Sequence, residues 1–137
     1  MRIKVHYVSQ KGCAKSIADV IAGTCQCTKE ALLPAYMPEN IDLMFLGCEG
    51  GKADKVTMDF INVMNRERVR NAALFCCGAG PEAVSQMRKA LVARGVNVLD
   101  RSFTAPLKGL FGGGPKPGDL SAAAEFAQNC MDDVSKK

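Results

Sequence analysis

Short apolar segments with the character of buried strands alternate along this chain with segments of helical periodicity. The densest apolar runs are residues 41–47 and 72–77. Each is followed by a glycine-containing turn and then by apolar residues spaced three and four apart. Such alternation indicates helical crossovers between parallel strands, with helices on both faces of one sheet. The pattern predicts the order β-α-β-β-α-β-α-β-α, with five strands and four or five helices.

The bounds of the expected elements follow from apolar periodicity and from capping residues. Strands are expected over residues 2–8, 30–33, 41–47, 72–77 and 96–99, with an extension of the last one to 105 left open, and helices over 14–22, 56–64, 84–94 and 119–134. Gly23 and Gly95 suit helix C-termini, Pro81 suits a first helical turn, and Asp119 suits an N-cap. The fold class is therefore a three-layer, doubly wound α/β fold with a five-stranded parallel sheet.

The size and composition indicate one globular domain. The chain has 137 residues, so we expect residues 1–137 to form a single domain. Apolar residues make up 47% of the chain and charged residues 23%, which is typical of globular proteins. No apolar run approaches the ~18 residues of a membrane span. Residues 1–8 alternate charged and apolar side chains, unlike a signal peptide, so we expect a cytoplasmic protein.

Charge and residue usage exclude several classes of function. The net charge of +4 is mild, and acidic residues interrupt or flank the basic cluster at residues 66–70, which we interpret as a solvated turn. With two Tyr and no Trp, few side chains could stack on bases, so we expect no nucleic-acid partner. Because the apolar runs are short, we also expect no membrane partner. The single histidine, His6, lies within a strand and is interpreted as structural. A hydrolase built on a catalytic histidine is therefore not expected.

Three loops are expected to meet at one edge of the sheet. In open α/β sheets, ligands bind beyond the carboxyl ends of the strands, where the strand order reverses. This rule selects the loops at residues 9–14, 47–52 and 77–82.

The first of these loops has the features of an anion cradle. It reads Ser9-Gln10-Lys11-Gly12-Cys13-Ala14, between an expected strand and an expected helix. Such a turn directs backbone N–H groups and the positive end of the helix dipole at an anion. The alternative is an ordinary strand-to-helix turn that contains a glycine. The loop matches neither the dinucleotide pattern G-x-G-x-x-G nor the P-loop pattern G-x-x-x-x-G-K-[ST].

These segments together resemble the short-chain flavodoxins. The similarity is carried by Met1 to Ser16 with Ser9-x-x-Gly12-x-x-Lys15, by Ile41 to Gly47, by Ala72 to Gly80, by Lys108-Gly109 onward and by Pro117 to Ala127. It covers nearly the whole chain. The resemblance implies a flavodoxin-like fold with strand order 2-1-3-4-5, FMN as the cofactor, and one- or two-electron transfer between partner proteins.

The resemblance also implies a set of cofactor-binding residues and no catalytic residue or metal ligand of the protein's own. The set comprises Ser9, Gln10, Lys11, Gly12, Cys13 and Ala14 around the phosphate, and Cys48, Glu49, Gly50, Gly51, Cys77, Gly78, Ala79 and Gly80 around the flavin ring. An electron carrier is favoured over an enzyme. The redox partner and the oligomeric state stay open.

Two other functions stay open beside FMN binding. Lys11 and Ala14 stand where flavodoxins have hydroxyls, and the second and third loops lack a stacking aromatic residue, which favours a domain that has lost FMN and serves as a binding or regulatory module. The third possibility rests on Cys13, Cys48 and Cys77, one in each edge loop, as a thiol-based redox or soft-metal site. The seven cysteines, an odd number, are otherwise expected to be reduced thiols in a cytoplasm.

Overall fold

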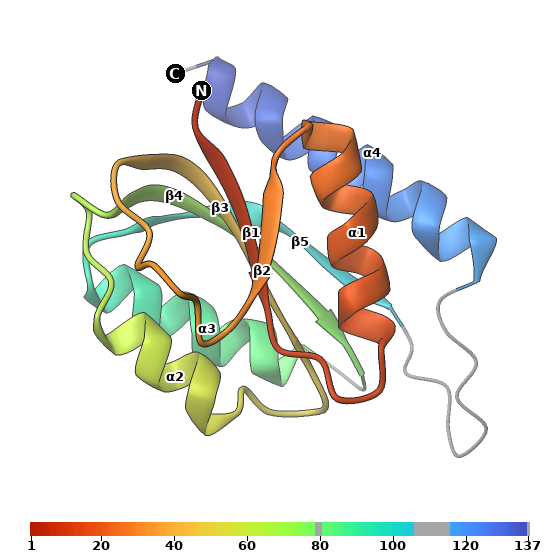
Figure 1. Ribbon diagram of the computed structural model, residues 1–137, viewed down its shortest axis with the longest axis horizontal. Helices are drawn as coiled ribbons and strands as arrows, with labels where there is room; N and C mark the ends of the chain where they lie inside the picture. The colour runs from red at the N-terminus through yellow and green to blue at the C-terminus, as the bar shows by residue number, and fades with distance from the viewer. Residues whose placement is uncertain (79–80, 106–115, 137) are drawn as a thin grey trace.

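Five strands and four helices alternate in the computed structural model, which describes residues 1–78, 81–105 and 116–136. The strands are β1 (Ile3–Tyr7), β2 (Thr28–Ala31), β3 (Ile41–Glu49), β4 (Val69–Cys77) and β5 (Asn97–Ala105), and the helices are α1 (Cys13–Cys25), α2 (Lys55–Asn62), α3 (Glu82–Ala93) and α4 (Pro117–Ser135). The strands form one parallel sheet in the order β2-β1-β3-β4-β5 (Figure 1). The predicted element order and strand order are confirmed.

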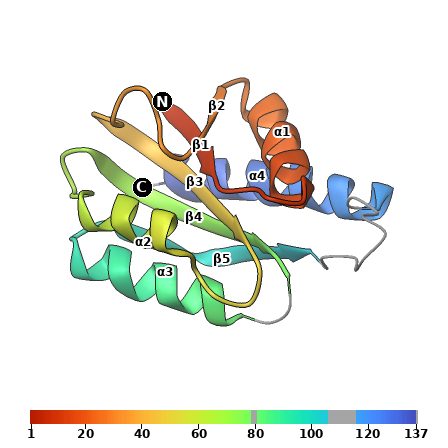
Figure 2. The same cartoon turned by 60° about the horizontal axis from the view of Figure 1, so that its bottom comes forward.

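The helices lie on both faces of the sheet, as the alternating pattern requires. Helices α1 and α4 cover one face, and α2 and α3 cover the other (Figure 2). Successive residues of β3 and β4 point to opposite faces. Phe45 and Phe75 therefore pack beneath α1 and α4, whereas Leu46 and Leu74 pack beneath α2 and α3. Burying a side chain of this size contributes about 1.5–3 kcal/mol, so the two central strands anchor both halves of the core.

Strand β3 is longer than expected, and this affects the site. The strand was expected to end at Gly47, with Cys48 and Glu49 in the following loop. It runs to Glu49, because β4 continues beside it to Cys77. Strand β2 also differs from the expected span, since it pairs with β1 over Thr28–Ala31 rather than over residues 30–33.

Two helix termini were predicted wrongly. Helix α1 continues past Gly23 to Cys25 and is closed by Gln26, whose φ of 53° is left-handed. Helix α4 begins at Pro117 rather than after an Asp119 N-cap. Asp119 instead occupies the third helical position, where its carboxylate accepts a hydrogen bond of 3.0 Å from the backbone N–H of Lys116. Within the described ranges, no helix is both long and apolar enough to span a membrane.

Candidate functional site

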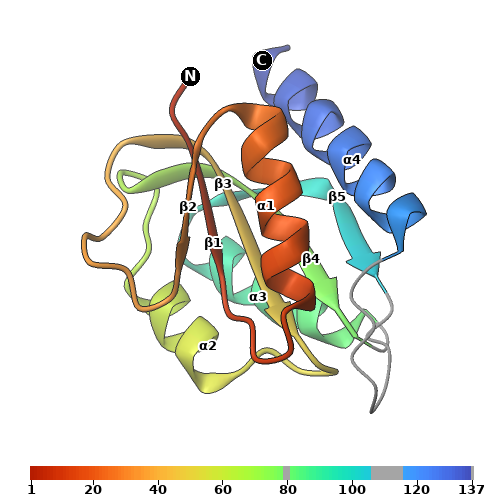
Figure 3. The same cartoon turned by 45° about the vertical axis from the view of Figure 1, so that its right-hand side comes forward.

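The carboxyl ends of β1, β3 and β4 lie at the same end of the sheet. The turn from β1 into α1 is adjacent to the ends of β3 and β4 there (Figure 3). Tyr7 pairs with Gly47, and Glu49 pairs with Cys77, so β3 extends two residues beyond the last residue of β1 that pairs with it. This extension brings the side chain of Glu49 level with the turn that the sequence predicts as an anion cradle.

The carboxylate of Glu49 fills that turn. The Ser9 hydroxyl donates a hydrogen bond of 2.7 Å to Oε2 of Glu49, and the Ala14 backbone N–H donates one of 2.9 Å to the same oxygen. The backbone N–H groups of Gln10 and Lys11 donate to Oε1 at 2.7 and 2.8 Å. The turn was predicted to hold a phosphate of the cofactor, and the anion that it binds in the structure is a side chain of the protein itself.

The alternation of β3 explains why Glu49 reaches the cradle. Phe45, Gly47 and Glu49 lie on the α1 face of the strand, because side chains alternate with a period of two. A Cβ atom on Gly47 would lie 2.1 Å from a ring carbon of Phe75. Gly47 thus leaves room for the Phe75 ring, and Glu49 is the next residue on this face.

Ser9 also organises the turn itself. Its hydroxyl oxygen accepts hydrogen bonds from the backbone N–H groups of Gly12 and Lys15, at 3.1 and 3.2 Å. Gly12 adopts a φ of +88°, a left-handed conformation that glycine adopts without strain. The turn is therefore built around one hydroxyl and one glycine, the two residues of the loop that match the flavodoxin pattern.

The environment of Glu49 favours its charged form. Partial burial acts to raise the pKa of this carboxyl, but hydrogen bonds from the Ser9 hydroxyl and from the N–H groups of Ala14, Lys11 and Gln10 together outweigh it. The pKa of Glu49 is consequently lower than its ordinary value. Glu49 is therefore held ionised in the cradle at neutral pH.

A disulfide joins Cys13 to Cys77 beside the cradle. Cys13 is the first residue of α1 and Cys77 the last residue of β4, with Cα atoms 6.1 Å apart. The expectation of seven reduced thiols is therefore wrong for these two residues, and the other cysteines are free. The prediction that Cys13 and Cys77 lie at the same edge of the sheet is confirmed.

The third predicted member of the thiol site, Cys48, lies on the opposite face of the sheet. Its neighbour there is Cys76, with the two Sγ atoms 3.7 Å apart and both residues buried. The alternation of β3 and β4 separates this pair from the disulfide. Three thiols do not converge, and in the described part of the chain no group of three or more Cys, His, Asp or Glu residues could hold a metal ion.

The loops after β3 and β4 lie against each other. The Gly50 N–H donates a hydrogen bond of 2.8 Å to the Cys77 carbonyl, and the Gly78 N–H donates one of 2.9 Å to the Ala105 carbonyl. A Cβ atom on Gly78 would lie 2.8 Å from the Gly50 carbonyl oxygen. These two loops were predicted to border the flavin ring, and in the described part they are in direct contact.

The predicted site residues thus fall into three groups. Those that meet around the carboxylate, the disulfide and the β3–β4 contact are Ser9, Gln10, Lys11, Gly12, Cys13, Ala14, Glu49, Gly50, Cys77 and Gly78. Cys48 lies on the far face, and exposed Gly51 follows the contact. Ala79 and Gly80 lie outside the described residues. The sequence placed these loops at one edge of the sheet, as the structure does, but it missed the hydrogen bonds that Glu49 makes with the first loop.

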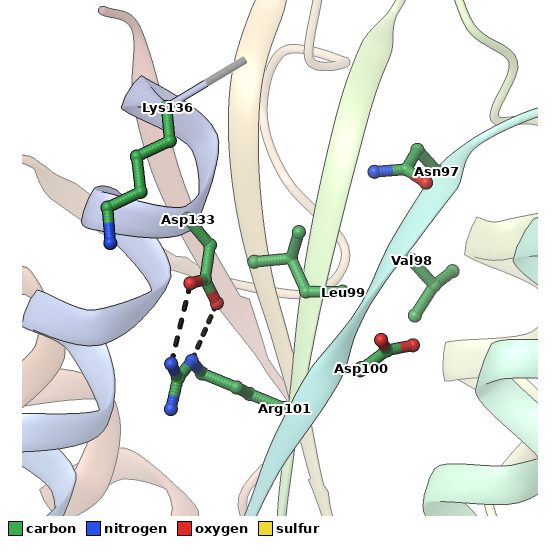
Figure 4. Close-up of a pocket in the computed structure, with 7 residues that line it drawn as sticks. All are labelled: Asn97, Val98, Leu99, Asp100, Arg101, Asp133 and Lys136. Atoms are coloured by element: carbon green, nitrogen blue, oxygen red, sulfur yellow. Dashed lines mark hydrogen bonds and ion pairs between the residues drawn. The ribbon is translucent and has the colours of Figure 1, made fainter.

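A surface hollow of about 530 Å³ lies elsewhere, between the start of β5 and the end of α4. It is lined by Asn97, Val98, Leu99, Asp100, Arg101, Asp133 and Lys136 (Figure 4). Across it, Nε of Arg101 donates to Asp133 at 2.6 Å. The hollow is at the amino end of the sheet, opposite the cradle, so it does not belong to the predicted site.

Comparisons with known structures identify the architecture. The chain is similar to a short-chain flavodoxin associated with a non-canonical PDU bacterial microcompartment, with a TM-score of 0.76 at 13% identity, and the match covers 98% of this chain and 99% of that one. It is similar to oxidised flavodoxin 2 from Bacillus cereus, with a TM-score of 0.72 at 20% identity over 97% and 99% of the chains. An NAD(P)H:quinone oxidoreductase from Methanothermobacter marburgensis gives 0.56 at 13% identity over 95% and 98%.

No family model and no curated protein matches the sequence. The fold is therefore flavodoxin-like, and the structural similarity extends over nearly the whole chain.

Proposed function

We propose that this chain is a flavodoxin-like domain that works without FMN, as a binding module whose edge loops respond to the redox state of the protein. One observation carries the proposal, namely the Glu49 carboxylate hydrogen-bonded by four donors of the loop that holds the phosphate in flavodoxins. Two further ties, the Cys13–Cys77 disulfide and the Gly50–Cys77 hydrogen bond, support it.

The second candidate is an FMN-binding electron carrier, which the similarity to flavodoxins favours. The donors around Glu49 are of the right type for a phosphate, since backbone N–H groups and a hydroxyl suit any oxyanion. The Glu49 carboxylate that occupies the cradle, however, is not compatible with a bound phosphate. A phosphate monoester carries a charge of about −1.5 to −2 at neutral pH. Two unit charges 4 Å apart near a protein surface repel by about 4 kcal/mol.

A repulsion of that size weakens binding about a thousandfold, so phosphate and an ionised Glu49 exclude each other from the cradle. The residues as they stand therefore do not fit FMN, and binding requires Glu49 to leave. Tyr36, one of two aromatic residues in other loops that could stack on a flavin, is 86% exposed in the connection between β2 and β3. The other candidate, Phe111, lies outside the described residues.

A titration with FMN, and in parallel with riboflavin, which lacks the phosphate, tests the proposal. We expect the unreduced wild-type protein to bind neither at roughly 100 μM ligand, a concentration at which a site of about −5.5 kcal/mol is detected. Glu49→Ala removes the resident anion and leaves the backbone donors in place. We expect it to bind FMN at least about tenfold more tightly than riboflavin, because the freed donors again accept a phosphate.

Glu125→Ala is the matched control, because it removes the same charge from an exposed position on α4. We expect it to behave like the wild type. Micromolar binding of FMN by the wild type, with the flavin fluorescence quenched, would contradict the proposal and support the electron carrier.

As partners we propose other proteins, with nucleic acid and membranes excluded on the grounds of charge and composition given above. We also propose that the protein is located in the cytoplasm. In a reducing compartment the Cys13–Cys77 pair is expected to be a dithiol except under oxidising conditions. A binding module with such a pair would change state when those conditions change.

A further inference from the structure

The Cys13–Cys77 disulfide and the Glu49 carboxylate tie together the same parts of the molecule. Cys13 is followed directly by Ala14, whose N–H donates to Glu49 at 2.9 Å. On the sheet, Glu49 and Cys77 are register partners on neighbouring strands. The start of α1 is thus attached to the end of β4 by a covalent bond and to the end of β3 by hydrogen bonds.

We propose that Cys13 and Cys77 form a reversible dithiol–disulfide site whose oxidised state locks Glu49 in the cradle. The inference rests on the proposed role of Glu49 as the occupant of the cradle. In the oxidised state the first residue of α1 is attached to β4 by the disulfide, and Glu49 on the neighbouring strand keeps its hydrogen bonds to the cradle. In the reduced state the hydrogen bonds of Glu49 still join the cradle to the end of β3.

The reaction is a thiol–disulfide exchange with a dithiol, such as a protein cysteine pair. A thiolate of the dithiol attacks one sulfur of the bridge and forms a mixed disulfide, and the other sulfur of the bridge leaves as a thiolate. The second thiolate of the reductant then releases the first sulfur. In total, two electrons and two protons pass from the dithiol to Cys13 and Cys77, and the reductant becomes a disulfide.

The position of Cys13 favours it as the sulfur that leaves. It is the first residue of a helix of 13 residues, where the helix dipole stabilises a thiolate. The Glu49 carboxylate, bound to the next residue, acts in the opposite sense. Cys76, next to Cys77 in sequence, faces the other side of the sheet with Cys48, so neither thiol of that pair lies on the face of the bridge.

Burial connects the bridge to Glu49 kinetically. Cys13 is 3% exposed and Cys77 is fully buried, so a reductant reaches the sulfurs only when the cradle moves away from the strands. The hydrogen bonds of Glu49 oppose that movement. Removing the carboxylate should therefore accelerate reduction of the bridge, although Glu49 forms no part of it.

Thiol counting tests whether the bridge forms and opens in the folded protein. Without reductant, the denatured wild type should show five thiols, and after reduction it should show seven. Dithiothreitol should open the bridge while the far-UV circular dichroism stays native, and removal of the reductant in air should restore it. In Glu49→Ala the reduction should be at least about tenfold faster, whereas Glu125→Ala should match the wild type.

Amide hydrogen exchange tests the lock itself. The N–H groups of Gln10, Lys11 and Ala14 should exchange at least about tenfold faster in the reduced protein than in the oxidised protein. The double variant Cys13→Ser/Cys77→Ser should exchange like the reduced wild type under all conditions. Cys27→Ser, a change at a partly buried cysteine outside the site, should leave the difference between oxidised and reduced forms intact.

Three outcomes would overturn the inference. The first is seven thiols in the protein kept in air. The second is a bridge that opens only when the whole protein unfolds, as a permanent structural disulfide would. The third is equal exchange of the cradle amides in both redox states. FMN binding by the oxidised wild type would overturn the proposed function instead, and it would leave the thiol count unchanged.

Discussion

At the scale of single residues, His6 shows how burial sets a pH dependence. The side chain is 1% exposed, and neither ring nitrogen has a hydrogen-bond partner in the described part of the protein. Its ring packs against Phe60 of α2, with centroids 5.3 Å apart. Burial lowers the pKa of His6 from its ordinary value of 6.5, with Glu30 acting in the opposite sense. The sequence interpretation, a structural histidine with its hydrogen bonds satisfied, is therefore wrong about the hydrogen bonds, and burial favours the neutral form of the ring.

The free energy of unfolding should consequently fall on acidification through His6. The unfolded chain takes up a proton below pH 6.5 while the folded histidine stays neutral, so acid favours unfolding. We expect a constant contribution above about pH 7. As the pH falls from 6.5 toward the lowered pKa of the folded histidine, we expect a loss of at most about 1.4 kcal/mol per pH unit. Urea unfolding between about pH 5 and 8 measures this slope.

His6→Asn is the control for that slope, because asparagine is polar and does not titrate. Its stability should be lower overall but flat across the same interval. An equally steep slope in His6→Asn would assign the effect to another group.

Gly47 is the residue whose lack of a side chain the packing requires. Because a Cβ atom would lie 2.1 Å from the Phe75 ring, we expect Gly47→Ala to lower the free energy of unfolding by about 1–3 kcal/mol. Gly23 gives the contrast, since a Cβ atom there meets nothing within 4 Å inside α1. Gly23→Ala should raise stability by about 0.5–1 kcal/mol. Chemical denaturation of both variants measures the difference, and equal effects would contradict the packing argument.

At the scale of elements, the sequence predicts the order of the strands and helices better than the residues at which they begin and end. Apolar periodicity identified the four helices and four of the five strands, because the core selects those positions. The edge strand β2 has no buried residue, and its span was predicted wrongly. The first and last residues of an element depend on contacts with neighbouring segments, and apolar periodicity carries no information about these contacts. Strand β3 reaches Glu49 because β4 continues beside it, and α1 passes Gly23 because Gln26 adopts the left-handed conformation instead.

The contact between Glu49 and the cradle was missed because β3 was predicted to end two residues too early, at Gly47. The sequence analysis placed Glu49 in a loop, where the direction of its side chain is not defined, and assigned it to the residues around a flavin ring. Placed in the strand, it lies two residues after Gly47 and therefore on the α1 face, next to the cradle. An acidic residue at this position, beside a loop without the usual hydroxyls, was the available signal.

The disulfide was predictable in part. The topology brings the first residue of α1 and the last residue of β4 to one edge, and the sequence named both cysteines for that reason. It also named Cys48, because the choice of face depends on the register of β3 and β4, which the sequence did not determine. Counting alternate residues from a known strand end places Cys48 and Cys76 on one face of the sheet and Cys77 on the other, which is the face that α1 covers.

At the scale of the whole molecule, the residues of this flavodoxin-like fold are tied to one another at the carboxyl edge of the sheet. Three ties meet there: the Glu49 carboxylate in the cradle, the Cys13–Cys77 bridge, and the hydrogen bond from Gly50 to Cys77. The similarity to flavodoxins fixes the layers and the strand order. It does not fix the chemistry of the edge, because the same fold carries different sites.

A carboxyl NMR titration measures whether the cradle holds Glu49 in its ionised form. We predict that Glu49 titrates below its ordinary pKa of 4.5, and that the amide protons of Gln10, Lys11 and Ala14 shift with the same midpoint. A carboxyl that titrates at 4.5 or above, with these three amides unmoved, would mean that the cradle does not hold Glu49.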